Sequence, residues 1–180
     1  MATAKPMTDT KSRRDFVRRN HTCVVSYARK TAPPSMSIVH YGMDGDDIVF
    51  LTMAERQKAK AVLRDGQLSA CILAGESKGL SWPPEYLVVD CKARVVTDMD
   101  EVMQVAAKII PIMSGQPLPE EALPVVRQHM EKEKRVVIRI TPESTFHSPA
   151  VHPKDDGEFE GADDDKTLHG LGARLPWRED

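Results

Sequence analysis

Residues 47–73 read DIVFLTMAERQKAKAVLRDGQLSACIL, which predicts an apolar strand, a short helix over 54–64 and a second apolar strand. Asp65 and Gly66 form a typical helix stop before the second strand. The helix carries four basic side chains: Arg56, Lys58, Lys60 and Arg64. An anion at the start of a helix gains from unpaired backbone N–H groups and from the helix dipole. The run therefore predicts either an anion site or, as charge runs more often are, a solvated helix face.

Alternating apolar residues predict antiparallel strands on both sides of this segment. Before it, strands are expected over 21–29 and 35–43. The DGDD sequence at 44–47 is a hairpin signal, so the first three strands should follow one another as a meander. After it, strands are expected over 85–97, where the alternation is clearest, and over 135–144.

Helical spacing predicts helices over 12–20, 98–113 and 118–134, with Pro111 closing or kinking the second and Pro124 interrupting the third. The first helix should turn Phe16 and Val17 inward. Six antiparallel strands with helices inserted between the third and fourth and between the fifth and sixth indicate a mainly β fold. The expected architecture is a small closed or split β-barrel with helices packed outside. No GxGxxG motif follows any strand, which argues against a parallel Rossmann arrangement.

Composition narrows the class of protein. A formal net charge of -2 over 180 residues argues against nucleic-acid binding through global charge. No run approaches the roughly 18 apolar residues of a membrane span, and the N-terminus lacks the apolar middle of a signal peptide. The three cysteines lie in apolar runs without a CxxC pair, and no histidines have metal-ligand spacing. We expect a cytoplasmic protein with reduced thiols, no metal site, no membrane contact and no nucleic-acid partner.

The chain divides into three parts. Residues 1–12 are expected to be a flexible N-terminus and 13–148 the folded domain. Residues 149–180 are acidic and contain glycine and proline, which favours a flexible tail that Trp177 pins to a surface. Trp82, in the 74–85 loop, is equally consistent with a lid over the cofactor or substrate pocket and with a packing or dimer contact.

The strand, basic helix and strand of 47–73 resemble the phosphate-binding region of the split-barrel flavin proteins. This is the pyridoxamine 5'-phosphate oxidase-like superfamily, with its deazaflavin-dependent branch. The similarity extends to PSMSIVHY (34–41), EYLVVDCKARVV (85–96) and RQHMEKEKRVVIRITPESTF (127–146). The resemblance covers about residues 13–148 and implies an FMN-binding split barrel.

Carried over residue by residue, the resemblance assigns Arg56 and Lys58 to the cofactor phosphate. Leu51 and Thr52, at the end of the preceding strand, would contact the phosphate or the ribityl chain. The ring would be lined, largely by backbone atoms, by Ser37, Ile38 and Val39. Tyr86 stands where relatives present a polar side chain to the flavin, often from the partner subunit.

The sequence also departs from the family pattern. Ala61 replaces an asparagine that relatives often place three residues after the lysine. Cys91 replaces a strand glycine, and the first hairpin keeps only Pro34 of its usual turn. These departures bear on cofactor affinity more than on the fold.

The resemblance implies a homodimeric oxidoreductase that binds coenzyme F-420 or FMN at the dimer interface and transfers hydride to a small organic substrate. Because the cofactor carries the chemistry, no catalytic side chain is assigned. Lys60 and Arg64 offer charge for the oligoglutamate tail of coenzyme F-420, which favours the deazaflavin, although a solvated role stays open. The alternative is a non-catalytic protein that binds or sequesters flavin, haem or pyridoxal phosphate. Nucleic-acid binding is a weaker third possibility, because the basic helix lacks interleaved aromatic residues.

Overall fold

The computed structural model describes residues 7, 9–75, 86–148, 152–153, 159–160 and 174–178. Within them, the helices are α1 (Thr10–Arg19), α2 (Gln57–Asp65), α3 (Met99–Ser114), the short 3-10 helix η1 (Glu120–Ala122) and α4 (Leu123–Lys132). The strands are β1 (Thr22–Tyr27), β2 (Ser35–His40), β3 (Gly42–Asp44), β4 (Asp47–Met53), β5 (Gln67–Leu73), β6 (Tyr86–Val96), β7 (Arg135–Ser148), β8 (His152–Pro153), β9 (Phe159–Glu160) and β10 (Leu175–Pro176). Trp82 and most of the 74–85 loop lie outside the described residues.

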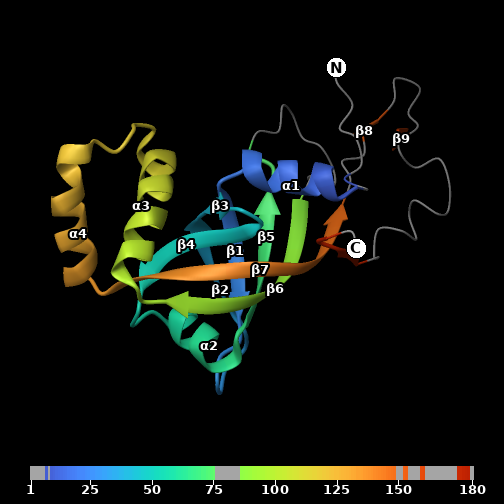
Figure 1. Ribbon diagram of the computed structural model, residues 1–180. Helices are drawn as coiled ribbons and strands as arrows, with labels where there is room; N and C mark the ends of the chain where they lie inside the picture. The colour runs from blue at the N-terminus through green and yellow to red at the C-terminus, as the bar shows by residue number, and fades with distance from the viewer. Residues whose placement is uncertain are drawn as a thin grey trace.

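The main sheet is antiparallel and runs in the order β2-β1-β5-β6-β7-β4-β3, with β10 added to β7. Its two end strands, β2 and β3, are consecutive in the chain and are separated only by Tyr41. The sheet therefore curls round on itself into a split β-barrel flanked by helices, as the sequence predicts (Figure 1).

Tyr41 divides the strand that the sequence predicts over 35–43. Its backbone N–H donates to the His21 carbonyl at 2.9 Å, and its buried hydroxyl donates to the Val17 carbonyl at 2.8 Å. At this residue the chain stops pairing with β1 and starts pairing with β4. The predicted hairpin at 44–47 is confirmed, because Asp44 of β3 pairs with Asp47 of β4, but the meander is interrupted: β4 pairs with β3 and β7 and not with β2. Alternation of apolar residues indicates a strand but not which neighbour it pairs with.

The barrel interior is filled by apolar side chains from the inward faces of the strands. Helix α1 lies across one end of the barrel and contributes Phe16 and Val17, both fully buried, as the sequence predicts (Figure 1). Each large apolar side chain buried in this way contributes about 1.5–3 kcal/mol. The interior therefore holds α1 and the strands together as one unit.

A second apolar cluster lies outside the barrel, where α3 covers β4 and β7. The cluster contains Val49, Val96, Val102, Val105, Ala106, Ile109, Met130 and Val137. Helix α3 continues through Pro111 to Ser114, so Pro111 does not close the helix as one prediction allowed. In α4, Pro124 occupies the first turn, where a missing N–H is tolerated; the expected helix over 118–134 is thereby split into η1 and α4.

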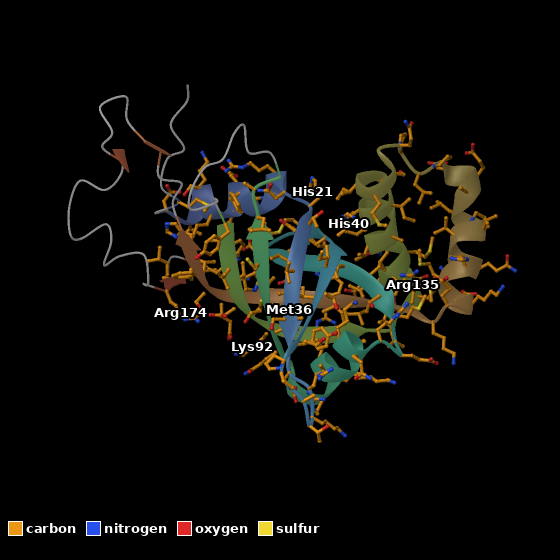
Figure 2. The ribbon with its side chains drawn as sticks, turned by 180° about the vertical axis from the view of Figure 1, so that it is seen from behind. His21, Met36, His40, Lys92, Arg135 and Arg174 are labelled. Carbon is orange, nitrogen blue, oxygen red and sulfur yellow. The ribbon has the colours of Figure 1, made fainter. Side chains whose placement is uncertain are left out.

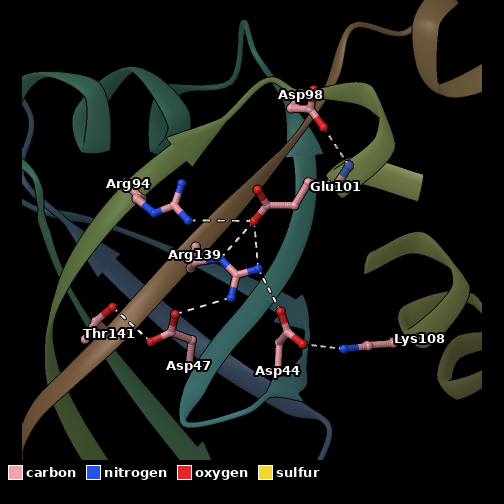
Figure 3. A network of polar contacts seen from close by, with 8 residues as sticks. All are labelled: Asp44, Asp47, Arg94, Asp98, Glu101, Lys108, Arg139 and Thr141. Atoms are coloured by element: carbon pink, nitrogen blue, oxygen red, sulfur yellow. Dashed lines mark hydrogen bonds and ion pairs between the residues drawn. The ribbon is translucent and has the colours of Figure 1, made fainter. Parts of the chain in front are cut away.

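Arg139 on β7 connects α3 to the barrel through a network of ion pairs (Figure 3). Its guanidinium lies 2.7 Å from both Asp44 on β3 and Glu101 on α3, and 3.3 Å from Asp47 on β4. The Arg139 side chain is only 12% exposed, so solvent screens these pairs less than ordinary surface pairs. Lys108 on α3 completes the connection by pairing with Asp44.

Two element ends differ from the sequence expectation. Helix α2 begins at Gln57 and not at residue 54, because a turn in which Arg56 N–H donates to the Met53 carbonyl at 3.1 Å precedes it. Strand β7 continues to Ser148, beyond the predicted 135–144, because it pairs along the whole of β6. Within the described part of the chain, the helices are too short or too polar to cross a membrane.

Candidate functional site

Helix α2 lies at the end of the barrel opposite α1 (Figure 1). Its apolar face, Ala59, Ala61 and Val62, is buried against the strands. Gly66 ends the helix with a left-handed φ of 64°, donates to the Val62 carbonyl at 2.8 Å and accepts a hydrogen bond from Ala93 N–H. The basic residues of α2 are therefore directed away from the core, toward solvent and the loop between β1 and β2.

The β1–β2 hairpin supplies three hydroxyl groups beside α2. Its register places Tyr27 opposite Ser35, and Val25 opposite Ser37, so these side chains share the inward face of the hairpin. The Tyr27 hydroxyl lies 3.3 Å from Ser37 Oγ. Ser37, which the resemblance assigns to the cofactor, and Ser35, which the register places opposite Tyr27, therefore both lie at the Tyr27 phenol.

The pKa of Tyr27 shows what surrounds its hydroxyl. Hydrogen bonds with the Ser35 and Ser37 side chains lower this pKa below its ordinary value. The positive charges of Lys58 and Arg29 lower it further. The Tyr27 hydroxyl thus meets Ser37 on β2 and lies within the positive field of Lys58, whose helix α2 packs against β1.

A hollow of about 740 Å³ separates the β1–β2 loop from α2. It is lined by Arg29, Lys30, Thr31, Ala32, Gln57, Lys60, Leu63 and Arg64. Four of these side chains are basic, and they come from both walls of the hollow. Arg64 is already engaged, because it pairs with Asp65 and donates to the Ala28 carbonyl at 3.0 Å.

Several basic side chains at the start of α2 lack the carboxylate partners that most other described lysines and arginines have. Lys92 pairs with Glu143 at 2.8 Å, as most described lysines and arginines outside the site pair with a carboxylate. By contrast, no carboxylate in the described ranges lies within ion-pair distance of Arg56, Lys58 or Lys60. Helix α2 also begins without a side-chain cap. Unpaired cations beside free helix N–H groups attract an anion.

The other predicted residues near α2 take different positions. Arg56 is the exposed residue that precedes the first helical residue, so it is not on the first turn as expected. Thr52 is buried, on the barrel side of β4. Leu51 points the opposite way and packs against the α3 cluster, which leaves only its backbone to face the site. The assignment of these residues to a cofactor stays a prediction.

The remaining predicted residues do not gather around Lys58. Val39 is buried on the inward face of β2, whereas Ile38 is 74% exposed on the outward face. Tyr86 begins β6 and stacks on Phe146 with ring centroids 6.0 Å apart. It precedes Lys92, near α2, by six residues, or about 20 Å of extended strand. Within one chain, Tyr86 therefore lies far from the basic end of the barrel.

The sequence assignment omitted Tyr27, Ser35, Arg29 and Lys30. The signal was present in the adjacent cations of the β1–β2 loop and in the alternation of serines along β2. These residues can be assigned to the site only once the register of the β1–β2 hairpin is known. The loop between the two strands is too long to determine that register from sequence.

The cysteines offer no reactive group at this site. Cys23 and Cys91 are buried in the barrel, and burial raises the pKa of the Cys23 thiol to about 12. All three cysteines are free, as the sequence predicts. Across the described residues, no three His, Cys, Asp or Glu side chains are placed to share a metal ion. The groups gathered at α2 are hydroxyls and cations, which suit the binding of a phosphate.

Solved structures with the same fold belong to proteins of several kinds. A conserved hypothetical protein from Mycobacterium tuberculosis superposes with a TM-score of 0.68 at 22% identity, over 83% of this chain and 88% of that one. An F-420 reductase gives 0.53 at 17% identity, over 73% and 93%. The haem storage protein from Vibrio cholerae gives 0.56 at 17% identity, over 74% and 89%. At these identities the likeness shows the fold alone.

The sequence itself identifies the family. No curated protein matches the chain. The family model described as pyridoxamine 5'-phosphate oxidase matches residues 10–148, which span α1 to the end of β7. The chain therefore belongs to the pyridoxamine 5'-phosphate oxidase family of split-barrel proteins.

Proposed function

We propose that this protein is an oxidoreductase that binds coenzyme F-420 or FMN and transfers hydride between the cofactor and a small organic molecule. The observation that carries the proposal is the group of basic side chains without described carboxylate partners at the start of α2: Arg56, Lys58 and Lys60. Holding such charges together without counter-charges costs stability, which a bound phosphate offsets. The family and the fold support a flavin-type cofactor.

The residues present fit the phosphate of such a cofactor. Lys58 supplies a point charge, Arg56 a two-donor fork, and the uncapped end of α2 supplies backbone N–H groups. Half-buried Ser37 and the backbone of β2 would line the ring, whereas the Val39 side chain belongs to the barrel core. The cofactor supplies hydride transfer when bound, and the chain binds it, orients it and keeps water from it.

Coenzyme F-420 is the favoured cofactor. FMN ends in one compact phosphate, whereas coenzyme F-420 continues past its phosphodiester into an acidic oligoglutamate tail. The hollow beside α2 offers this tail Arg29, Lys30 and Lys60, which lie beyond the residues that one phosphate needs. Arg64 contributes less, because Asp65 already neutralises it.

A titration tests the proposal directly. Purified protein is titrated with coenzyme F-420 and with FMN while cofactor fluorescence is followed, and we expect dissociation constants in the micromolar range or tighter. Tighter binding of coenzyme F-420 that weakens with added salt would support the role of the hollow. Absence of a fluorescence change with both cofactors would refute the proposal.

We infer that the protein acts as a homodimer, joined through the outer face of β2, β1, β5, β6 and β7. Cross-strand pairing aligns one apolar row across these strands: Ile38, Val24, Cys71, Val88 and Phe146. The described helices lie elsewhere, and Figure 2 looks onto this face, with the 70% exposed Met36 labelled on β2. Because the row is uncharged, a second copy related by a two-fold axis meets it without burying an unpaired charge.

Dimerisation would also complete the cofactor site. Strand β2 carries Ser35 and Ser37 on its inward face and Met36 and Ile38 on its outward face. A partner packed on the outward face would hold this edge strand, and therefore the site, in place. A dimer also provides a second wall for a tricyclic ring, and brings the Tyr86 end of one chain within reach of the partner.

The Ile38→Asp variant tests the interface. Wild-type protein is expected to run as a dimer in size-exclusion chromatography with light scattering, and Ile38→Asp as a monomer with weakened cofactor binding. Val125→Asp, at an equally exposed position on α4, is the matched control and should remain dimeric. A wild-type monomer in the presence of cofactor would contradict the inferred dimer.

A second candidate is a protein that binds or sequesters its cofactor without turnover. Ala61 and Cys91, where relatives place asparagine and glycine, are both buried and offer the cofactor no polar side-chain contact from α2 or β6. One protein of the same fold is a haem storage protein. Cofactor binding without reduction of an enone, a quinone or a biliverdin-like acceptor would favour this candidate over catalysis.

A further inference from the structure

Tyr27 places a phenol hydroxyl on the β1–β2 hairpin, beside helix α2. Tyr27 is the last residue of β1 and is only 7% exposed. Its hydroxyl oxygen lies 3.3 Å from Ser37 Oγ. The cofactor contacts that the sequence predicts do not include this residue. The positive charge of Lys58 acts on this hydroxyl from α2, the helix that packs against β1.

The Tyr27 proton is available when the Ser37 hydroxyl donates to the phenol oxygen, a direction that the contact between them permits. A phenol offers one donor and accepts through its oxygen, and a serine hydroxyl also does both. When Ser35 and Ser37 donate to the Tyr27 oxygen, the phenol proton has no acceptor among the described residues. A phosphate oxygen placed between Tyr27 and Lys58 would supply that acceptor.

The charges around the hydroxyl favour an anion there. Lys58 on α2 and Arg29 on the β1–β2 loop are the charged groups that act on it, and both are positive. Together with the two serines they lower the pKa of Tyr27, which indicates a surrounding potential that stabilises negative charge. A phenol in such a place donates a strong hydrogen bond to a phosphate.

Tyr41 shows how a structural tyrosine of this chain differs. Its hydroxyl donates to the Val17 carbonyl inside the protein, and burial raises its pKa above the ordinary value. The Tyr41 hydroxyl therefore fastens the chain at the β2–β3 junction. The two tyrosines, one at the end of β1 and one between β2 and β3, provide a matched pair for experiment.

We propose that Tyr27 is a phosphate-binding residue, whose hydroxyl is oriented by Ser35 and Ser37 and donates a hydrogen bond to the same phosphate that Lys58 holds. The inference rests on the proposed function only in taking this phosphate to be that of a flavin-type cofactor. It makes the β1–β2 hairpin, as well as α2, part of the phosphate site.

The test removes the hydroxyl and compares ligands with and without phosphate. Tyr27→Phe and wild type are titrated with FMN and riboflavin, and with coenzyme F-420 and its phosphate-free deazariboflavin. We expect Tyr27→Phe to weaken binding of the phosphorylated ligands about ten-fold and to leave the others within two-fold. Equal weakening of both ligand types, or no weakening of either, would overturn the proposal.

Two further variants keep the outcome interpretable. Tyr41→Phe should lower the melting temperature and leave the dissociation constant for FMN unchanged in the folded protein. Ser35→Ala should weaken FMN binding less than Tyr27→Phe does, because it disturbs the orientation of the hydroxyl and not the donor. If Tyr27→Phe does not fold, a Ser35→Ala variant that binds FMN and riboflavin as wild type does would overturn the proposal.

Inorganic phosphate separates this inference from the proposed function. If wild type binds neither FMN nor coenzyme F-420, the proposed function fails, and calorimetry with inorganic phosphate then decides the role of Tyr27. Weaker phosphate binding by Tyr27→Phe than by wild type would support the role. Equal binding by the two, or none by wild type, would refute it.

Discussion

Lys58 illustrates how a single residue acquires a function from what surrounds it. Its side chain is half-buried on α2, its charge acts on the Tyr27 hydroxyl, and no carboxylate of the described chain pairs with it. Lys92 has the same chemistry but is exposed on β6 and paired with Glu143. The residue type is the same in both, but burial and partner differ, and the unpaired charge is the one available to a ligand.

Replacing Lys58 should weaken cofactor binding. Lys58→Ala removes one charge-assisted contact, worth about 1.5–3 kcal/mol, so the dissociation constants for FMN and coenzyme F-420 should rise about ten- to a hundred-fold. The measurement is fluorescence titration. Lys92→Ala is the control and should bind as wild type does; an unchanged affinity in Lys58→Ala would remove Lys58 from the site.

At the scale of elements, α3 is held to the barrel by two kinds of contact. Its apolar face packs over β4 and β7, and the Arg139 network ties it to β3 and β4 (Figure 3). Lys108 and then Arg139 hydrogen-bond to Asp44 and lower its pKa below the ordinary value of 3.8. The carboxylate of Asp44 is therefore part of what fixes the helix.

This network predicts how stability depends on pH. Because the folded pKa of Asp44 is lowered, its contribution is fully present above about pH 4 and is lost as the pH falls through the folded value. Asp44→Asn should lower the urea midpoint at pH 7 and lose less further stability between pH 4 and pH 2 than wild type does. Asp15→Asn, which breaks an exposed pair with Arg18, is the control and should behave as wild type. Parallel curves for Asp44→Asn and wild type would contradict the assignment.

At the scale of the whole molecule, residues 174–178 are part of the folded domain. Strand β10 pairs with β7, and Trp177, 1% exposed, joins the core cluster of the barrel. The backbone N–H of Trp177 donates to the Glu143 carbonyl at 3.0 Å, and the guanidinium of Arg13 on α1 donates to the Pro176 carbonyl at 2.7 Å. The end of the chain thus packs against α1 and β7 together.

Removing this tryptophan should destabilise the whole barrel. Trp177→Ala leaves a large cavity in the core, which costs about 3–5 kcal/mol in the free energy of unfolding. Chemical denaturation measures the loss. The neighbouring Arg178→Ala removes only a 3.8 Å pair with Asp46 and should change stability by less than about 1 kcal/mol. A Trp177→Ala protein as stable as wild type would show that the barrel does not depend on its C-terminus.

Several features could be predicted because they depend on local pattern. Period-two alternation located β6, helical spacing placed Phe16 and Val17 in the core, and Asp65 with Gly66 marked the end of α2. The division of the 35–43 strand at Tyr41 could not be predicted in this way. It depends on hydrogen bonds to His21 and Val17, which lie about 20 residues earlier in the chain.

The sequence by itself determined which segments form strands and helices and that a basic helix lies between two apolar strands. It could do so because those properties follow from neighbouring side chains and from backbone preference. Only the tertiary structure decided which of the described cations lack carboxylate partners, that Tyr27 meets Ser37 beside α2, and that Leu51 and Tyr86 lie elsewhere in one chain. Those facts depend on strand register and on contacts between distant residues, which a linear pattern does not encode.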